Sequence, residues 1–217
     1  INSNKFQWTH EDRIVGVPET QRDATFSPEQ VFALHIPHLS DHTGGRLREE
    51  GISPGYLLQF HDTDVTDLYP SSTDWRRLFA WTPQITSTIR YNTKLAQPEG
   101  YVDSLANRLP MIRLPELYLI SAEASLDTDP AKSRAHINEL RQHRECDITI
   151  PDGVTDPAIL RAEILLEYRR EFISEGLLFY YYKRLDADQV EGVAGNYDKT
   201  LYVLPIPLEE IEFGNRF

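Results

Sequence analysis

Cysteine is nearly absent from the sequence. Cys146 is the one cysteine among 217 residues, so the chain forms no disulfide within itself. Cytosolic proteins and many bacterial exported proteins share this low content, which leaves the cellular compartment open. No apolar run approaches the ~18 residues that a membrane-spanning helix requires. The sequence begins at Ile1 instead of methionine, and we expect a processed product or the C-terminal part of a longer protein, with any targeting segment outside it.

Positive charge is also scarce. The chain has 22 Lys and Arg residues against 34 Asp and Glu residues, its formal net charge is −12, and its basic residues never form a run longer than two. A protein that binds nucleic acid needs a concentrated basic surface to displace the counterions of the phosphates. The sequence therefore predicts no nucleic-acid partner.

Apolar and aromatic residues are plentiful by contrast. The hydrophobic fraction is 40%, and the chain has 11 tyrosines, 9 phenylalanines and 3 tryptophans. This composition excludes a disordered chain, and the length suffices for one large domain or two small ones with a real core. We therefore expect a folded protein.

Residues 109–126 predict a central helix of the core. Good helix formers follow Pro115, and Leu114, Leu117, Tyr118 and Ser121 have the spacing of one helical face. Proline is tolerated in the first turn, where amide groups have no partner within the helix. We therefore expect residues 109–126 to form one helix, buried on most sides, that carries two carboxylates, Glu116 and Glu123.

A second long helix is predicted over residues 156–184, with Asp156 as its N-cap and a bend at Gly176. Apolar residues surround most of its circumference, as in a buried helix. Charged residues lie among them, and buried charge is costly unless it is paired. We therefore expect structural ion pairs rather than catalysis from Arg113, Glu116, Glu123, Glu167, Arg170, Glu171 and Glu175.

The remaining pattern is less regular. It predicts strands at 29–36 and 85–95, helices at 56–68 and 129–144, a last helical turn at 207–211, and a glycine-rich loop at 40–55. The fold class expected is mainly α and loop-rich, with a few short strands. Residues 1–108 form a loop- and strand-rich segment with possible ligand-binding loops, and 109–217 form a helical core, together one continuous domain.

Two further patterns have residue types that occur in metal sites. Three histidines have helical spacing, but Pro37 interrupts the helix on which they would bind a metal; they are His35, His38 and His42. The acidic run 62–67 lacks the glycine and the glutamate that an EF-hand loop needs at its sixth and twelfth positions. We expect neither a metal site nor a cofactor. A carboxylate pair of a glycoside hydrolase or lyase remains the alternative function, and an intracellular helical scaffold a third.

Four segments of the second half, in order, resemble the SusD/RagB family of Bacteroidetes. They are LPMIRLPELYLISAEA (109–124), NELR (138–141), EYRREFISEG (167–176) and LPIPLEEI (204–211), the last followed by Asn215. EQVFAL (29–34) and DWRR (74–77) resemble it more loosely. The sequence departs from the family pattern at Leu178 and Tyr181, where the family has arginine and aspartate, while Lys183 and Arg184 are retained.

The resemblance implies a function. Members of this family are about twice as long, with a lipidated N-terminal cysteine and tetratricopeptide-like helices in the half that this sequence lacks. It implies a surface-exposed lipoprotein of the outer membrane that captures glycan or peptide nutrients. Such a protein covers a TonB-dependent transporter of the SusC type and cleaves no bond. Its contact with the membrane is the N-terminal lipid anchor alone.

Aromatic side chains stack on sugar rings, and polar side chains hold the hydroxyl groups. Several such residues lie in the loop-rich region before residue 83, where binding residues often concentrate. The expected ligand-binding residues are Tyr56, Tyr69, Asp74, Trp75, Arg77 and Trp81. The alternative is that the aromatic residues are buried anchors of their loops.

Overall fold

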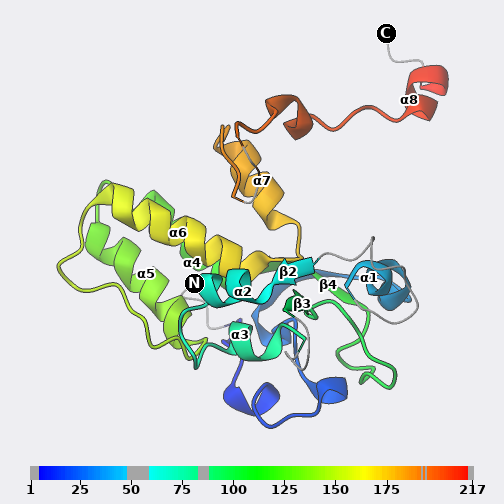
Figure 1. Cartoon of the computed structure of the whole chain (residues 1–217), viewed down its shortest axis with the longest axis horizontal. Helices are drawn as coiled ribbons and strands as arrows, with labels where there is room; N and C mark the ends of the chain where they lie inside the picture. The colour runs from blue at the N-terminus through cyan, green and yellow to red at the C-terminus, as the bar shows by residue number, and fades with distance from the viewer. Residues whose placement is uncertain (1–4, 48–58, 83–87, 192, 194, 215–217) are drawn as a thin grey trace. The chain divides into compact units, whose positions relative to one another are not determined.

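The computed structural model describes residues 5–47, 59–82, 88–191, 193 and 195–214 (Figure 1). Within these ranges short helices and four short strands alternate with loops, which confirms the expected mainly α, loop-rich fold class. The chain forms two compact units, Ile1–Glu175 and Gly176–Phe217. Strands from before and after residue 108 pair within the first unit, so the two segments distinguished in the sequence share one body there.

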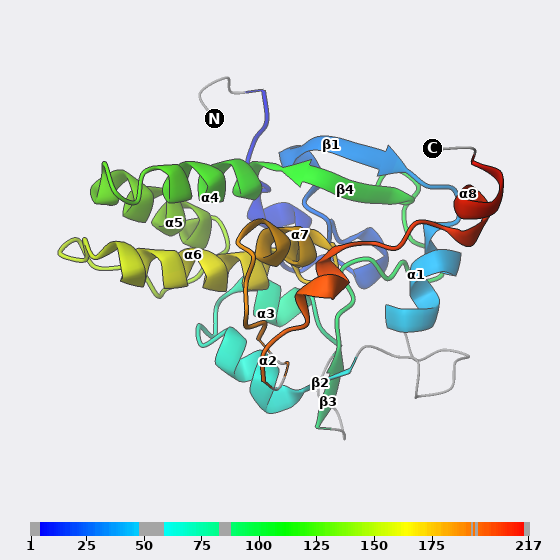
Figure 2. The same cartoon turned by 90° about the horizontal axis from the view of Figure 1, so that it is seen from above.

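The first unit contains an antiparallel pair of strands, β1 (Gln30–His35) and β4 (Arg108–Arg113), side by side in Figure 2. The strand expected at 29–36 is confirmed, whereas the helix expected from residue 109 is wrong over 109–113. Pro110 is buried within β4, and the helix begins only at Leu114. The partner that makes this segment a strand lies about 75 residues earlier, which local periodicity does not reveal.

The middle of the chain has small elements. Helix α1 (Leu39–Leu47) replaces part of the glycine-rich loop that was expected, and β2 (Gln59–His61) pairs with β3 (Ile89–Tyr91). The helix expected at 56–68 is α2 (Asp62–Leu68) alone, with residues 56–58 outside the described part. Of the strand expected at 85–95, residues 85–87 lie outside the described part, and the structure has β3 over Ile89–Tyr91.

Three helices pack against one another as the helical core of the first unit: α4 (Leu114–Ala124), α5 (Pro130–Gln142) and α6 (Pro157–Phe172). Figure 2 shows them side by side. Aspartates cap the second and third, since Asp129 and Asp156 accept hydrogen bonds from backbone amides of the first turn. Their fully buried apolar side chains are Leu119, Ala122, Ile137, Leu140, Leu160, Ile164 and Phe172.

The long helix expected over 156–184 is wrong as a single element. Helix α6 ends at Phe172, and α7 (Leu177–Arg184) starts anew after Gly176. Between them Ser174 and Gly176 have φ angles of 65° and 80°, in the left-handed region that does not continue a right-handed helix. The bend expected at Gly176 is therefore a complete break.

The second unit consists of α7, the short 3-10 helix η5 (Lys199–Tyr202) and α8 (Leu208–Phe213), joined by loops and drawn from orange to red in Figure 1. The last helical turn expected at 207–211 is α8. Across all the residues that the structure describes, no helix has both the length and the apolar character needed to span a bilayer.

Candidate functional site

A buried cluster of ion pairs lies where β4, α5 and α6 meet. Arg113 donates from Nη1 to Glu171 Oε1 at 2.7 Å and from Nη2 to Glu175 Oε1 at 2.8 Å. Arg113 and Glu171 have no exposed side-chain area. The two residues come from a strand end and a helix end, so this pair connects two elements of the first unit.

Arg144 and Arg76 extend the cluster from two other directions. Arg144, just after α5, donates to Glu29 Oε2 at 2.6 Å and to Glu171 Oε1 at 2.9 Å. Arg76, on α3 (Trp75–Phe79), donates to Glu167 Oε2 at 2.8 Å and to Asp74 Oδ2 at 2.7 Å. Three separate segments, which are β4, α3 and the residues just after α5, are thus paired with Glu167 and Glu171 of α6.

The cluster is balanced in charge. Arg141 and Arg170 each donate to Glu167 Oε1 at 2.8 Å, and Arg141 also pairs with Glu163. Lys94 pairs with Glu175, which is also a partner of Arg113. We call this set the charge cluster; its six cations are Arg76, Lys94, Arg113, Arg141, Arg144 and Arg170, and its six carboxylates are Glu29, Asp74, Glu163, Glu167, Glu171 and Glu175.

The carboxylates at its centre are held ionised. Burial alone would raise the pKa of Glu167, but Arg76, Arg141 and Arg170 outweigh it and lower the pKa to about 2. Burial opposes ionisation of Glu171 in the same way, and the charges of Arg144, Arg113 and Lys94 bring its pKa well below the usual value. A general acid or base works best with a pKa near the working pH. These carboxylates therefore suit structural pairing.

Glu116 and Glu123 occupy a different environment on α4, where both are half-buried. Burial raises the pKa of Glu116, and the nearby charge of Arg113 only partly offsets that effect. Glu116 Oε2 has no hydrogen-bond partner within the part of the chain that the structure describes. Glu116 is thus close enough to feel the charge of Arg113, but at least one of its carboxylate oxygens accepts no hydrogen bond from the described residues.

Sequence reasoning did not single out several members of the charge cluster: Glu29, Arg76, Lys94, Arg141, Arg144 and Glu163. Three of them stand inside segments that carried the family resemblance, namely Glu29, Arg76 and Arg141. The presence of charged residues inside these segments was the feature of the sequence that could have identified the three as members of the charge cluster. Nothing in the local pattern marks Lys94 or Arg144, whose partners come from distant parts of the chain.

The aromatic residues expected to bind ligand are buried. Tyr69, Trp75 and Trp81 have exposed fractions of 1%, 6% and 4%. Tyr69 and Trp81 pack in one apolar cluster with Val65, and Tyr69 Oη donates to the carbonyl of Arg170 at 2.8 Å. No ring of these three has an open face for a sugar. Their role in binding stays a prediction, and their positions fit the alternative of buried loop anchors.

The polar residues of the expected site are also engaged. Asp74 belongs to the charge cluster and caps α3, because its carboxylate accepts from the amide of Arg76 at 2.9 Å. Arg77 is half-buried and donates to the carbonyl of Tyr69 at 3.2 Å. Tyr56 lies outside the described residues. The structure thus brings Tyr69 and Arg77 together but places Trp75 in a separate cluster with Ile14.

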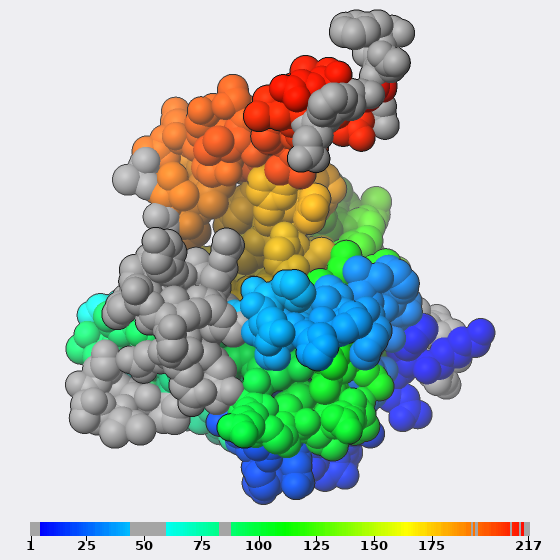
Figure 3. All heavy atoms as spheres, turned by 90° about the vertical axis from the view of Figure 1, so that its right-hand side faces the viewer, coloured from blue at the N-terminus to red at the C-terminus, as the bar shows by residue number. Residues whose placement is uncertain are grey.

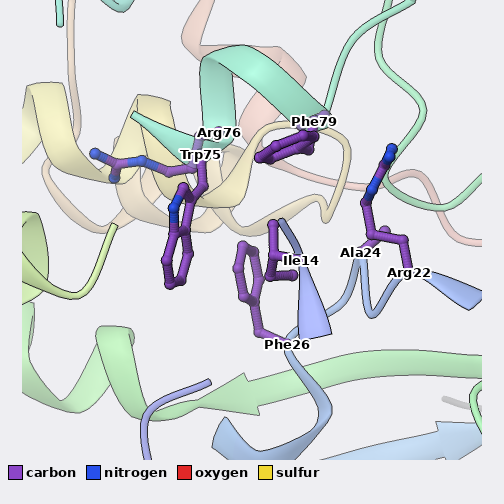
Figure 4. Close-up of a pocket in the computed structure, with 8 residues that line it drawn as sticks. Ile14, Arg22, Ala24, Phe26, Trp75, Arg76 and Phe79 are labelled. Atoms are coloured by element: carbon purple, nitrogen blue, oxygen red, sulfur yellow. The ribbon is translucent and has the colours of Figure 1, made fainter. Parts of the chain in front are cut away.

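A small cavity opens beside Trp75 (Figure 4). Its volume of about 10 Å³ holds roughly one water molecule, which is too little for a sugar ring. Arg22 lies with its guanidinium 4.8 Å from the centre of the Phe79 ring, and its buried Nε has no hydrogen-bond partner within the described residues.

No group of three or more His, Cys, Asp or Glu side chains suited to a metal ion occurs among the residues that the structure describes. The acidic run at 62–67 contributes to the start of α2 instead. Asp64 accepts from the amide of His61, and Asp62 lies 3.3 Å from Arg90. These carboxylates have protein partners.

The comparisons with known proteins agree with one another. The model of the SusD family matches residues 58–211, more than two thirds of the chain. A search of curated proteins gave no match. A SusD superfamily protein from Bacteroides thetaiotaomicron is similar over 98% of this chain and 52% of its own, with 22% identity and a TM-score of 0.67.

Two similar structures come from Bacteroides vulgatus. A SusD superfamily protein is 19% identical over 98% of this chain and 50% of its own, with a TM-score of 0.64. A SusD-like carbohydrate-binding protein is 19% identical over 81% of this chain and 37% of its own, with a TM-score of 0.53. The chain therefore spans about half the length, or less, of these solved structures.

Proposed function

The chain belongs to the SusD family, and from this premise we propose that it binds glycan nutrients without cleaving them. The family match over residues 58–211 is the observation that carries the proposal. One similar structure is described as a SusD-like carbohydrate-binding protein, which supports a saccharide as the ligand class. A peptide is the other ligand that the family resemblance allows.

The charge cluster supports a non-catalytic role. A glycosidase needs two carboxylates that face a substrate, one of them with a raised pKa so that it can donate a proton. Glu167 and Glu171 are fully buried and paired with arginines, and both have lowered pKa values. Neither carboxylate has the environment of a general acid.

Location and partner are further parts of the proposal. We place the protein at the outer membrane surface as a lipoprotein, where it delivers its ligand to a TonB-dependent transporter of the SusC type. The chain spans about half the length of its solved relatives, so this activity belongs to the protein as a whole.

The experiment is a binding screen that also detects cleavage. Isothermal titration of the chain against a panel of neutral oligosaccharides and peptides measures binding, and chromatography of the same mixtures measures hydrolysis. We expect saccharide binding with every oligosaccharide recovered intact. Binding of peptides alone would overturn the ligand class, and new reducing ends or unsaturated products would overturn the non-catalytic role.

The expected site residues enter the same screen. Trp75→Ala and Trp81→Ala remove buried rings, so each variant is compared with the wild type for unfolding free energy as well as affinity. Lost affinity at unchanged stability would support direct contact with the ligand. Lost affinity that follows lost stability would support a role as a loop anchor.

A further inference from the structure

The second unit carries a row of aromatic rings that the expected site did not include. Tyr180 and Phe179 on α7 are 5.3 Å apart between ring centres, Phe179 and Tyr202 are 5.9 Å apart, and Tyr202 and Tyr197 are 4.8 Å apart. The row thus runs continuously from Tyr180 to Tyr197. Its members belong to α7, η5 and the loop between them.

Exposure varies along the row. Tyr180 is 60% exposed, Phe179 and Tyr197 are half-buried, and Tyr202 is 5% exposed. Tyr202 Oη donates to the carbonyl of Ala187 at 3.2 Å, which fixes the middle of the row to the loop. Figure 3 draws atoms of this unit, orange to red, on the molecular surface. The exposed ring is therefore supported from beneath by packed aromatic neighbours.

An ion triad lies next to the row. Lys199 Nζ is 2.7 Å from Asp186 Oδ2 and 2.7 Å from Asp188 Oδ1. The two carboxylate side chains are 75% and 74% exposed, so they retain free acceptor positions toward solvent. The amide of Tyr197 also donates to the carbonyl of Asp188 at 2.7 Å, which ties the triad to the end of the row.

This combination selects for one kind of ligand. Aromatic faces pack against the apolar C–H faces of sugars, and carboxylates accept hydrogen bonds from sugar hydroxyls. The triad has a net charge of −1, and Lys199 is already engaged by both aspartates. A uronic or sulfated sugar would bring its negative charge against these carboxylates. A neutral saccharide brings none.

We propose that Tyr180 and Tyr197, with the carboxylates of Asp186 and Asp188 held by Lys199, form a binding surface for a neutral oligosaccharide. The inference rests on the proposed function, because it supplies a site and a charge preference for the same capture of glycans. The surface lies entirely within the second unit. It is distinct from the buried aromatic residues at 69–81.

The test compares ring removal at exposed Tyr180 and half-buried Tyr197 in the 217-residue chain. The probes are neutral hexasaccharides of glucose, xylose and mannose, titrated calorimetrically. Tyr180→Ala and Tyr197→Ala should each weaken binding about tenfold, which corresponds to about 1.4 kcal/mol. Tyr180→Phe keeps the ring and should bind within about twofold of the wild type. Phe32→Ala, at a ring on β1 that is 51% exposed, is the matched control and should leave affinity unchanged.

A charge variant tests the preference for neutral ligands. Asp186→Asn/Asp188→Asn keeps acceptor oxygens but removes two negative charges. It should bind a galacturonate hexasaccharide at least about tenfold more tightly than the wild type at low salt, and the gain should shrink as salt screens it. An unchanged affinity for the acidic probe would overturn the charge preference.

The outcomes separate this inference from the proposed function. If the wild type binds a neutral hexasaccharide and both alanine variants bind it equally well, the surface assigned here is wrong while glycan binding stands. If the wild type binds none of the saccharides, both proposals fail. Circular dichroism and unfolding curves of each variant establish that lost affinity is not lost folding.

Discussion

The carboxylates of the two units differ in burial and in the number of their cationic partners. In the first unit, the charge cluster is buried, and each of its central carboxylates bonds to two or more arginines. In the second unit, Asp186 and Asp188 are about three quarters exposed and share one lysine. Buried, saturated pairs hold a scaffold together, whereas exposed acceptors remain free for a ligand.

Aromatic residues of both units range from buried to exposed. In the first unit Tyr69, Trp75 and Trp81 are buried while Phe32 is 51% exposed, and in the second unit Tyr202 is 5% exposed while Tyr180 is 60% exposed. Residue type alone therefore does not distinguish a ligand contact from a loop anchor. The burial of a ring makes this distinction, because only an exposed ring can contact a ligand without rearrangement of the fold.

Breaking the charge cluster should have the largest effect. Glu171→Ala leaves Arg113 and Arg144 buried without their shared carboxylate, and it should lower the unfolding free energy by about 3–5 kcal/mol. Urea denaturation measures the loss. Glu116→Gln, a half-buried position on α4 with an unpartnered oxygen, is the control and should change stability by less than about 0.5 kcal/mol. Equal effects of the two variants would contradict a structural role specific to the charge cluster.

The second-largest effect should come from acid, which lowers the unfolding free energy of the first unit. Burial opposes the charge of Glu167, yet its arginine partners lower its pKa from 4.5 to about 2, so the folded state gains stability above pH 4.5. That gain, about 3 kcal/mol, is lost as the pH falls from 4.5 toward 2. Unfolding free energies between pH 7 and pH 3 measure it. Glu167→Gln should flatten this slope, and an unchanged slope would contradict the assignment.

Removing one buried hydroxyl should have a smaller effect. Tyr69→Phe deletes the hydrogen bond from Tyr69 Oη to the Arg170 carbonyl and should cost about 1–1.5 kcal/mol. Tyr101→Phe is the matched control, because Tyr101 Oη donates to the Arg22 carbonyl at 2.7 Å from a less buried site. Its loss should be smaller. A larger loss at Tyr101 would reverse the ranking by burial.

The exposed ring should matter least for stability. Tyr180→Ala should change the unfolding free energy by no more than about 0.5 kcal/mol, because most of the ring already contacts water. Thermal and urea unfolding measure this change beside the affinity for neutral hexasaccharides. A loss above about 2 kcal/mol would make Tyr180 a packing residue.

The sequence predicted those elements that local chemistry determines. Asp129–Pro130 and Asp156–Pro157 mark the starts of α5 and α6, and the structure has both helices at those positions. Segment 109–113 was mistaken for helix because its strand partner, β1, is remote in the chain. The break after Phe172 was missed because Ser174 has a positive φ, which serine rarely adopts and which its residue type therefore does not signal.

The site was less predictable than the fold. The charged residues of α6 lie among apolar residues, so the sequence predicted that they are paired. It did not predict their partners Arg76 on α3 and Arg144 after α5, because these are brought to α6 by tertiary packing. Likewise, the sequence around Trp75 and Trp81 shows a concentration of aromatic residues but does not show that these two side chains are buried. The row from Tyr180 to Tyr197 was hidden because the expected long helix continued through the break that separates α7 from α6.

Hydrogen exchange of the chain with and without a saturating neutral hexasaccharide distinguishes a binding surface on the second unit from one at the charge cluster. We expect added protection at residues 177–202 and unchanged exchange at 163–175, which carry four carboxylates of the charge cluster. Protection centred on Glu167 and Glu171, with none at Tyr180 and Tyr197, would contradict this expectation.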